Sequence, residues 1–346
     1  MEKIRLGKTG MMVSKIGFGG IPIQRDTEEE SIEVVKKCLE LGINFLDTAN
    51  GYTTSEERIG KAIAGRREDV MIATKSGARN SEGVKEHLEL SLKRLNTDYI
   101  DLYQFHGVSN AEHLKIVTDP DGPMAVVKEA MKAGKIRHVG ITSHQIDIAK
   151  QAVETDLFES MMFPFNFIAY EPAEELHALC MKHDVGLIAM KPFAGGMLDN
   201  VTLAFKYLFQ FPQVVPIPGI ETPAEIEEIV ALLDKPQEIT EDEKKQMQQL
   251  RDELGNQFCR RCEYCQPCTM EIPISGVMTS NTLVRRLPPE RVFNGPFSGA
   301  IEKGRECSEC GECEERCPYN LPIRDIIKIR IRDFDEAKRK YMEQPA

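Results

Sequence analysis

Residues 44–76, NFLDTANGYTTSEERIGKAIAGRREDVMIATKS, begin and end with short apolar runs that have the length of β-strands. A stretch with the apolar spacing of a helix, residues 82–95, follows and leads to a further strand-like run at residues 99–106. Parallel strands need a crossover connection, and a helix usually provides it. This alternation therefore predicts a parallel sheet in a protein of the α/β class.

Eight strand-like runs alternate with helical stretches over residues 10–235. The runs are SKIGFG (14–19), NFLDTA (44–49), VMIATKS (70–76), YIDLYQFH (99–106), HVGITS (138–143), MMFPFN (161–166), GLIAMKP (186–192) and VVPIPG (214–219). Eight such units predict a closed (β/α)8 barrel of the TIM type. The alternative is an open, doubly wound sheet. It is disfavoured because the glycine-rich GFGG (17–20) lacks the G-x-G-x-x-G spacing.

The composition narrows the class of protein. The chain has 346 residues, which exceeds the usual size of a single core and predicts two domains. Its net charge of −11 argues against nucleic acids and anionic membranes as partners, because phosphate binding needs clustered Lys and Arg. The N-terminus has no apolar segment of signal-peptide type, and no apolar run approaches the length of a membrane span. We therefore expect a cytoplasmic protein.

Eight of the ten cysteines follow residue 258, in two compact runs. The runs are Cys259, Cys262, Cys265 and Cys268, then Cys307, Cys310, Cys313 and Cys317. In a cytoplasmic protein, such runs favour metal binding over disulfide bonds. The second run reads C-x2-C-x2-C-x3-C-P, which is typical of iron–sulfur ligation. Zinc is the alternative occupant, since C-x2-C pairs also bind it, but the regular spacing and the final Cys-Pro favour clusters.

Eight cysteines suffice for two 4Fe–4S clusters. In two-cluster ferredoxins the fourth cysteine of each run serves the other cluster. The expected ligand sets are Cys259, Cys262, Cys265 with Cys317, and Cys307, Cys310, Cys313 with Cys268. The first run departs from the usual pattern, because only two residues precede its fourth cysteine and Thr269, not Pro, follows it. One cluster plus a second metal site therefore remains an alternative.

Polar or ionisable residues occur at or just after the carboxyl ends of three successive strand-like runs. They are Asp47, Tyr52, Lys75 and His106. In a parallel barrel this edge carries the active site. Lys75 interrupts an apolar strand, so it needs a partner, and Asp47 can supply one. An ammonium group beside a phenol favours the phenolate form, which makes Tyr52 a candidate general acid, and His106 would orient or polarise a carbonyl oxygen.

The segments NFLDTANGYTTSEERIGKAI, MIATKSG and IDLYQFHG resemble the aldo-keto reductase family. The resemblance covers about residues 3–235. It implies a (β/α)8 barrel whose Asp-Tyr-Lys-His tetrad falls on the four residues named above, with hydride transfer between NAD(P)H and a small carbonyl or alcohol substrate. The cysteine-rich remainder resembles the ferredoxin-type extension on one branch of this family. The implied domains are a reductase barrel, 1–256, and a mainly helical, ferredoxin-like iron–sulfur domain, 257–346.

The same resemblance implies nicotinamide-binding positions in the later barrel segments. They are Ser143, His144 and Phe165, followed by Lys191, Pro192, Gly219 and Glu225 in the segments that hold the phosphates. Phe165 falls where the family places a ring against the nicotinamide. Ser143 and His144 match the nicotinamide contacts that follow the fifth strand.

Some positions depart from the family pattern. Thr53 follows Tyr52 where Gly is usual, and Met162 replaces a Gln that hydrogen-bonds the nicotinamide amide. Glu221 and Glu225 lie near the place where NADP-specific members present basic or hydroxyl groups. A carboxylate repels a 2′-phosphate, whereas a free ribose hydroxyl tolerates it. NADPH, NADH and a secondary role for any nicotinamide therefore stay open.

The two halves of the chain predict different electron chemistry, because nicotinamides exchange hydride and iron–sulfur clusters exchange single electrons. The leading prediction is a carbonyl-directed oxidoreductase whose clusters relay electrons from a ferredoxin-like partner. The alternatives are structural clusters, clusters that sense redox state, an electron-transfer protein whose barrel is a docking scaffold, and a zinc-stabilised binding protein. The basic residues of the helical tail, 323–342, are expected on a solvated face rather than in a binding patch.

Overall fold

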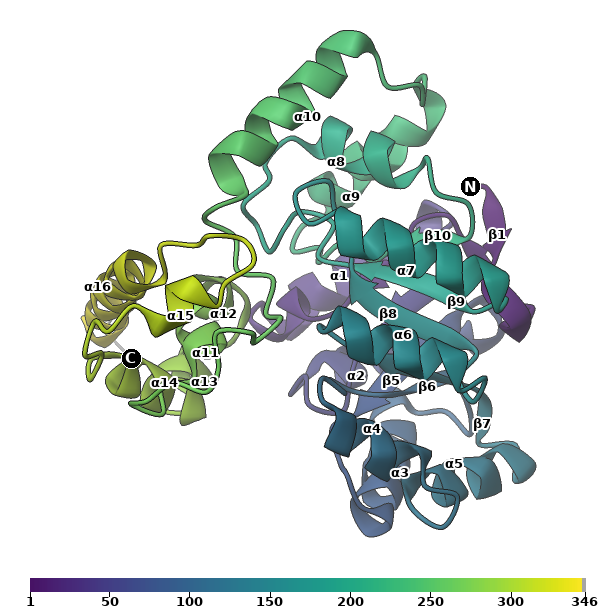
Figure 1. The fold of residues 1–346 in the computed structure, drawn as a ribbon. Coiled ribbons are helices and arrows are strands. Elements are labelled where there is room, and N and C mark those ends of the chain that lie inside the picture. Colours follow the sequence, from purple (N-terminus) through teal and green to yellow (C-terminus); the bar gives the residue numbers. More distant parts are fainter. Residues whose placement is uncertain (344–346) are drawn as a thin grey trace. The chain divides into compact units, whose positions relative to one another are not determined.

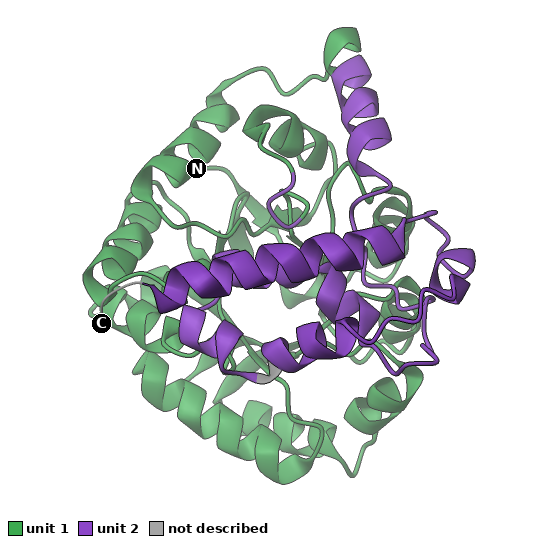
Figure 2. Ribbon diagram, turned by 90° about the vertical axis from the view of Figure 1, so that its left-hand side faces the viewer, with its two compact units in different colours: residues 1–194, 198–243 green, residues 195–197, 244–346 purple. Residues whose placement is uncertain are grey.

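The structure is a computed structural model that describes residues 1–343 and forms two compact units, coloured separately in Figure 2. Unit 1 comprises residues 1–194 and 198–243. Unit 2 comprises residues 195–197 and the chain from residue 244 onward. The sequence places the domain boundary later, between residues 256 and 257. The last three residues of that predicted second domain, 344–346, lie outside the described residues.

The centre of unit 1 is an eight-stranded parallel sheet (Figure 1). Its strands are β3 (Phe18–Gly19), β4 (Phe45–Asp47), β5 (Met71–Ser76), β6 (Ile100–Phe105), β7 (Ile136–Thr142), β8 (Ser160–Pro164), β9 (Gly186–Met190) and β10 (Val214–Pro216). Neighbours in the sheet follow the order of the chain. Each strand overlaps one of the eight runs expected from the sequence, so the predicted alternation is confirmed.

Backbone hydrogen bonds between the first and last strand segments close this sheet into a barrel. The Gly17 N–H donates to the carbonyl of Pro216 at 2.9 Å, and the Gly19 N–H donates to the carbonyl of Pro218 at 2.8 Å. Gly19 also pairs in parallel with Gly219. A Cβ atom on Gly19 would lie 2.7 Å from the Pro218 carbonyl oxygen, so this close approach requires glycine. The predicted closed (β/α)8 barrel is therefore confirmed.

Helices connect the strands of the barrel and lie outside it. They are α1 (Glu28–Glu40), α2 (Ser55–Ala62), α3 (Ser81–Leu95), α4 (Ala111–Thr118), α5 (Pro123–Lys132), α6 (Ile146–Glu154), α7 (Glu171–Lys182), α8 (Val201–Leu208) and α9 (Pro223–Ala231). Figure 1 shows α6 and α7 on the outer side of β8 and β9. Capping explains where several begin: Thr27 and Glu30 form a capping box before α1, and the Asn80 side chain caps α3.

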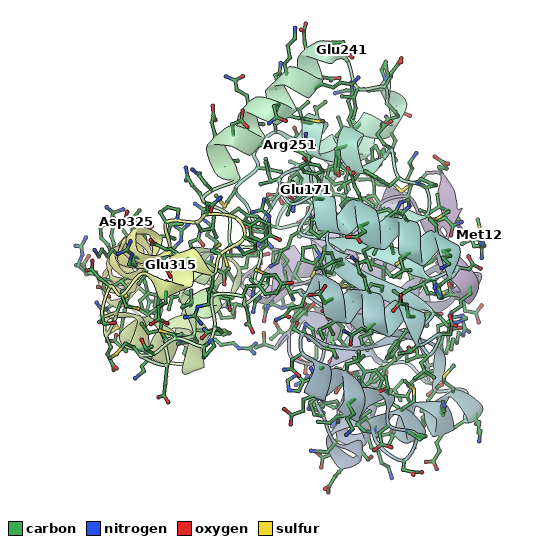
Figure 3. All side chains as sticks on the ribbon, viewed as in Figure 1. Met12, Glu171, Glu241, Arg251, Glu315 and Asp325 are labelled. Carbon is green, nitrogen blue, oxygen red and sulfur yellow. The ribbon has the colours of Figure 1, made fainter. Side chains whose placement is uncertain are left out.

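An N-terminal hairpin, β1 (Lys3–Arg5) and β2 (Met12–Ser14), fills the other end of the barrel. Its apolar residues Leu6, Met11 and Val13 belong to the same core cluster as inward side chains of six barrel strands. The sequence does not predict this hairpin, because strands of three residues are too short to show alternation. Met12 instead points outward, as does Glu171 in the first turn of α7 (Figure 3). The hairpin leaves the opposite end, where the parallel strands finish, available for a site.

Unit 2 is helical, as the sequence predicts. Its helices are most of α10 (Glu241–Leu254), followed by α11 (Ile274–Met278), α12 (Ser280–Arg286), α13 (Pro289–Phe293), α14 (Pro296–Gly304), α15 (Glu312–Glu315) and α16 (Ile323–Met342). Figure 2 shows α16 as a long rod with shorter helices along it, and α11, α12 and α14 contact it. The rings of Phe293 and Phe334 meet edge to face, with centres 5.2 Å apart, in the core of this unit.

The charged residues of α16 support the expectation of a solvated face. Arg324 pairs with Glu314 at 2.7 Å, and Lys328 pairs with Glu309 at 3.0 Å. Lys340 pairs with a glutamate one turn earlier on the same helix. Within residues 1–343, no helix combines the length and the apolar character that crossing a membrane requires.

Candidate active site and cluster pockets

The carboxyl ends of β4, β5 and β6 bring the four predicted catalytic residues together. Asp47 ends β4, Lys75 is the penultimate residue of β5, and His106 directly follows β6. Tyr52 lies in the turn after β4, half-buried. The His106 N–H donates to the Ser76 carbonyl at 2.8 Å, so the parallel ladder continues beyond the strand. Sheet pairing alone thus places Asp47, Lys75 and His106 on adjacent strand ends.

Lys75 and Asp47 form a buried ion pair at the centre of this group. The Lys75 Nζ atom lies 2.6 Å from Asp47 Oδ2, and both side chains are almost fully inaccessible. The ammonium also donates to the Thr48 carbonyl at 2.6 Å, while Gln104 Nε2 donates to Asp47 Oδ1 at 3.4 Å. Buried charges are tolerated when they are paired and hydrogen-bonded, and both conditions hold here.

The surroundings keep Lys75 charged. Burial by itself lowers the pKa of Lys75, but the Asp47 carboxylate and the Tyr52 phenol together outweigh it and raise that pKa above its ordinary value. Burial raises the pKa of Asp47, and the attraction of the Lys75 ammonium opposes that rise. An ammonium group is therefore held beside the tyrosine at neutral pH.

Tyr52 and His106 lie on the more open side of the ion pair. The Lys75 Nζ atom lies 5.0 Å from the centre of the Tyr52 ring. The rings of Tyr52 and His106 meet edge to face, with centres 5.8 Å apart and planes at 81°. Both side chains are half-buried, in contrast to Lys75. The arrangement can hold a transferable proton on Tyr52 and orient a polar atom with His106.

Thr53 shows how the chain accommodates the residue where the family usually has Gly. Its φ of +32° lies in the left-handed region that favours glycine. Its hydroxyl donates to the Gln24 side-chain oxygen at 2.9 Å, and the Ser55 N–H donates to the Tyr52 carbonyl at 2.8 Å. These bonds fix the turn that presents Tyr52.

Ser143 and His144 follow β7, at the same end of the barrel. Ser143 is fully buried, and its hydroxyl donates to the Gln145 carbonyl at 3.1 Å. The His144 N–H donates to the Ser109 hydroxyl oxygen at 3.4 Å, which ties this loop to the one after β6. Their expected contact with a nicotinamide stays a prediction.

Phe165 lies in a packed aromatic cluster. Its side chain has no exposed surface, because its ring packs against Phe211 with centres 4.8 Å apart and against Tyr207 at 5.9 Å. The ring is one member of this cluster, and its expected contact with a nicotinamide stays a prediction. The family resemblance placed Phe165 against the nicotinamide, and the sequence contained no signal for its packing on the distant Tyr207 and Phe211.

The loop after β9 carries the predicted phosphate-binding residues Lys191 and Pro192. Lys191 has a φ of +57°, and Ala194 also adopts a left-handed conformation, with a φ of +47°. The Asn166 side chain donates to the Lys191 carbonyl at 3.1 Å and also accepts hydrogen bonds from two backbone N–H groups, which stabilises the turn. Sequence reasoning missed Asn166, although a buried polar residue at a strand end was a usable signal.

The Glu225 side chain caps the N-terminal end of α9. The Glu225 carboxylate accepts hydrogen bonds from the backbone N–H groups of Glu221 at 2.7 Å and Thr222 at 3.1 Å. Thr222 and Glu225 thereby form a capping box. The N–H groups at a helix start commonly bind phosphate, but here an internal anion already occupies two of them.

Asp26 adds negative charge near Glu225. Burial raises the pKa of Asp26, and the negative charges of Glu30 and Glu225 raise it further, while two arginines act in the opposite direction. The Oδ2 atom of Asp26 is buried and makes no hydrogen bond within the described structure. The sequence did not single out Asp26, because one acidic residue in a loop carries no pattern.

Two pockets in unit 2 gather the eight cysteines of the two runs. One pocket is lined by Cys259, Cys262, Cys265 and Cys317, and the other by Cys268, Cys307, Cys310 and Cys313. The fourth cysteine of each run thus lies with the first three of the other run, as the predicted crosswise ligand sets require. Binding of iron at these cysteines stays a prediction.

The chemistry of the two pockets fits a bound cationic group. Burial raises the pKa of the Cys265 thiol to about 12, and the negative charges of Cys259 and Cys262 contribute to the rise. Thiolates in one pocket repel one another unless a cation is present, so these positions suit a metal-containing ligand. Within the described residues, no three His, Cys, Asp or Glu side chains are arranged to hold a single metal ion.

The rim of the second pocket differs from that of the first. Cys310 is exposed, and the Glu312 N–H together with the Ser308 and Thr269 side chains lowers its pKa. Thr269, which stands where Pro is usual, thus lies beside a predicted ligand. Hydrogen bonds to cysteine sulfur and exposure to solvent both tune an iron–sulfur cluster.

Each of the two units contains a match to a known protein family. The model of the Aldo/keto reductase family matches residues 15–202, and the model of a 4Fe-4S dicluster domain matches residues 258–322. The first match contains all four residues of the Asp-Tyr-Lys-His group. The second contains all eight cysteines of the two pockets.

Individual relatives match about three fifths of the chain. The uncharacterized oxidoreductase YqkF of Bacillus subtilis is 34% identical over 217 residues, which are 59% of this chain and 68% of that protein. The aldo-keto reductase YhdN of the same organism is 34% identical over 233 residues, covering 61% and 67%. L-Galactose dehydrogenase of Arabidopsis thaliana is 29% identical over 219 residues, covering 58% and 68%.

Solved structures show the same fold. A holo aldo-keto reductase from Bacillus halodurans has 28% identity and a TM-score of 0.64, covering 72% of this chain and 96% of that one. An aldo-keto reductase from Klebsiella pneumoniae in complex with NADPH has 20% identity and a TM-score of 0.62, covering 72% and 95%, and its likeness concerns the fold alone.

The crosswise grouping of cysteines predicts which substitutions remove the same cluster. Cys317→Ala and Cys265→Ala are expected to lose one spectroscopic signal, while Cys268→Ala and Cys313→Ala lose the other. In each variant the iron content should fall from about eight to about four atoms per chain, as two 4Fe–4S clusters imply. Anaerobic purification, iron and sulfide analysis, and electron paramagnetic resonance of the reduced protein provide the readout.

Cys180→Ala serves as the control, because Cys180 is buried on α7 in the barrel unit and should not affect iron. Loss of the same signal in Cys317→Ala and Cys313→Ala would instead mean that each run holds its own cluster.

Proposed function

This chain belongs to the aldo/keto reductase family, and on that premise we propose that it reduces the carbonyl group of a small molecule to an alcohol. The observation that carries the proposal is the buried Lys75–Asp47 pair directly behind Tyr52. Burying two charges is costly, so their place at the carboxyl ends of barrel strands is better explained by chemistry than by stability.

The reaction follows from the places of the four side chains. The chemistry that a nicotinamide would supply when bound is transfer of a hydride, that is one hydrogen with two electrons, to the carbonyl carbon. Tyr52 gives its proton to the carbonyl oxygen, so that the product is a neutral alcohol. The Lys75 ammonium stabilises the phenolate that remains on Tyr52, and Asp47 keeps the ammonium in place. His106, whose ring meets that of Tyr52, orients the carbonyl oxygen.

The acidic residues near α9 favour NADH over NADPH. By resemblance, the segment that begins α9 receives the adenosine phosphate of the cofactor. In this chain Glu225 already binds the N–H groups of Glu221 and Thr222, and Asp26 adds a second carboxyl nearby. A 2′-phosphate would be repelled by these groups, whereas a ribose hydroxyl can donate a hydrogen bond to a carboxylate.

The C-terminal unit supports a second part of the proposal, that two 4Fe–4S clusters relay single electrons between an external carrier and the enzyme. Two pockets of four cysteines each, and the dicluster family match, support it. The chemistry that such clusters supply is transfer of one electron at a time. Lys328 and Lys340 of α16 are paired with glutamates, so this helix gives no argument for an acidic carrier.

The relay is tested by anaerobic spectral titration of the holoprotein. Reduced ferredoxin is expected to bleach the cluster absorption. A carbonyl substrate added without nicotinamide should then take one electron from each of the two clusters, with one proton from Tyr52 and one from solvent, and restore the absorption. If the folded Cys265→Ala variant turns over at the wild-type rate with every electron donor, the clusters have a structural role instead.

Replacing Tyr52 with Phe removes only the hydroxyl that carries the proton. We expect kcat for the reduction of an activated aldehyde such as 4-nitrobenzaldehyde to fall by about 10²–10⁴-fold, the usual contribution of a general acid. The affinity for NADH should stay within about threefold, because the nicotinamide-binding positions lie on other loops. Stopped-flow absorbance of NADH gives the rate, and fluorescence titration gives the affinity.

Tyr170→Phe is a matched control on the chain segment that begins α7. Undiminished turnover in Tyr52→Phe would contradict the assignment of Tyr52 as the proton donor.

Glu225→Gln tests the cofactor preference without losing the helix cap, because Gln also completes a capping box. The wild-type protein is expected to bind NADH at least about tenfold more tightly than NADPH, which corresponds to about 1.4 kcal/mol. The variant should narrow that ratio, since it removes the negative charge that repels the 2′-phosphate. Titration of protein fluorescence with each nucleotide measures both affinities.

Glu228→Gln, an exposed change later on α9, is the control for a general effect of charge. Equal affinities for the two nucleotides in the wild-type protein would overturn the preference.

A further inference from the structure

Arg79 lies in the loop between β5 and α3. Its guanidinium group donates hydrogen bonds to backbone carbonyls of two neighbouring loops. Its Nη2 atom donates to the carbonyl of His106 at 2.7 Å and to that of Gly107 at 3.1 Å. Its Nη1 atom donates to the carbonyls of Gly77 at 3.1 Å and Ala78 at 3.2 Å. One side chain thus connects the loop that follows Lys75 with the loop that begins at His106.

The backbone carbonyls compensate the positive charge of Arg79. Among the described residues, the ion pairs pass from Lys75 to Arg94 along the chain, and none involves Arg79. The Nε atom of Arg79 is buried without a hydrogen-bond partner. Burial is the only resolved influence on its pKa, which it lowers. A half-buried arginine without an acidic partner is uncommon, because arginine usually pairs with carboxylates. The four converging carbonyl dipoles are therefore the groups that compensate its charge.

The backbone turn at Gly107 brings two carbonyl groups together beside Arg79. Gly107 has a φ of +65°, so the chain turns sharply just after His106. This turn directs the carbonyls of His106 and Gly107 toward the same nitrogen of Arg79. On the other side, the Gly107 N–H donates to the Thr142 hydroxyl at 2.8 Å. The turn is thus held from both sides, directly next to His106.

We propose that Arg79 is a positioning residue for His106. By holding the backbone carbonyls of His106 and Gly107, Arg79 fixes the His106 imidazole against the Tyr52 ring. This inference rests on the proposed carbonyl reduction. The planar fork of guanidinium spans two loops at once, which a lysine ammonium with its compact charge does not reproduce. Small displacements of a catalytic group, on the order of 1 Å, can reduce turnover by about 10²-fold.

The test compares Arg79→Met, Arg79→Lys and the control Arg66→Met in the full-length holoprotein. Arg66 is an exposed arginine whose partner is Asp69, in the segment before β5. With 4-nitrobenzaldehyde and NADH, Arg79→Met is expected to lose at least about tenfold in kcat, with KM and the NADH affinity within about threefold. Arg79→Lys should not restore kcat, and added guanidinium ion at millimolar concentration should restore part of it in Arg79→Met.

The alternative role is attraction of an anionic substrate by the positive charge. In that case the loss would appear in KM, and Arg79→Lys would restore it, which would overturn the positioning role. Wild-type kcat in a folded Arg79→Met variant would overturn it as well. If Arg79→Met does not fold, Arg79→Lys alone decides, because full kcat in that variant contradicts the need for a fork.

Nuclear magnetic resonance separates failure of this inference from failure of the proposed function. The imidazole Cε1–H signal of His106 is expected to shift in Arg79→Met and to stay unchanged in Arg66→Met, whether or not the protein reduces an aldehyde. An unchanged His106 signal in Arg79→Met would refute the positioning role. If the His106 signal shifts in Arg79→Met but the wild-type protein reduces no carbonyl, only the proposed reaction is contradicted.

Discussion

The 2.6 Å ion pair between Lys75 and Asp47 is the interaction on which the barrel site depends. Two charges removed from water are stable only when their geometry satisfies them, and here the parallel register of β4 and β5 provides that geometry. The closed barrel fixes the register, and the N-terminal hairpin fills the far end, so other groups can reach the buried pair only from the carboxyl ends of the strands. Tyr52 and His106 lie there. The fold thus holds a cation next to a phenol at the carboxyl ends of the barrel strands.

Periodicity made much of this architecture predictable. Each of the eight strands overlaps a run of apolar residues, and Lys75 stood out because a charge interrupted such a run. What the sequence did not show depends on contacts between distant residues. The hairpin strands are too short to show a period, and the burial of Phe165 depends on Tyr207 and Phe211, about 40 residues later. Arg79 was missed because its partners are backbone carbonyls, which leave no trace in sequence.

The spacing of the cysteines predicted how they group but not how exposed each one is. It predicted two crosswise sets, and the structure gathers the cysteines in those sets although the first run departs from the usual pattern. Spacing cannot show which pocket is open to solvent, because exposure is set by how the helices of unit 2 pack. Cys310 is exposed, whereas Cys265 is buried. The two pockets therefore offer different surroundings for chemically similar ligands, which is a reason to expect clusters that differ in redox behaviour.

The claim that Lys75 acts through Tyr52 is tested most directly by a double-mutant cycle on kcat. The cycle compares Lys75→Met, Tyr52→Phe and the double variant, each shown by circular dichroism to be folded. If the two residues act as a unit, the double variant will be no slower than Tyr52→Phe alone, because the ammonium has no phenolate left to stabilise. Losses that multiply in the double variant would show that Lys75 acts independently of Tyr52 and would contradict the account.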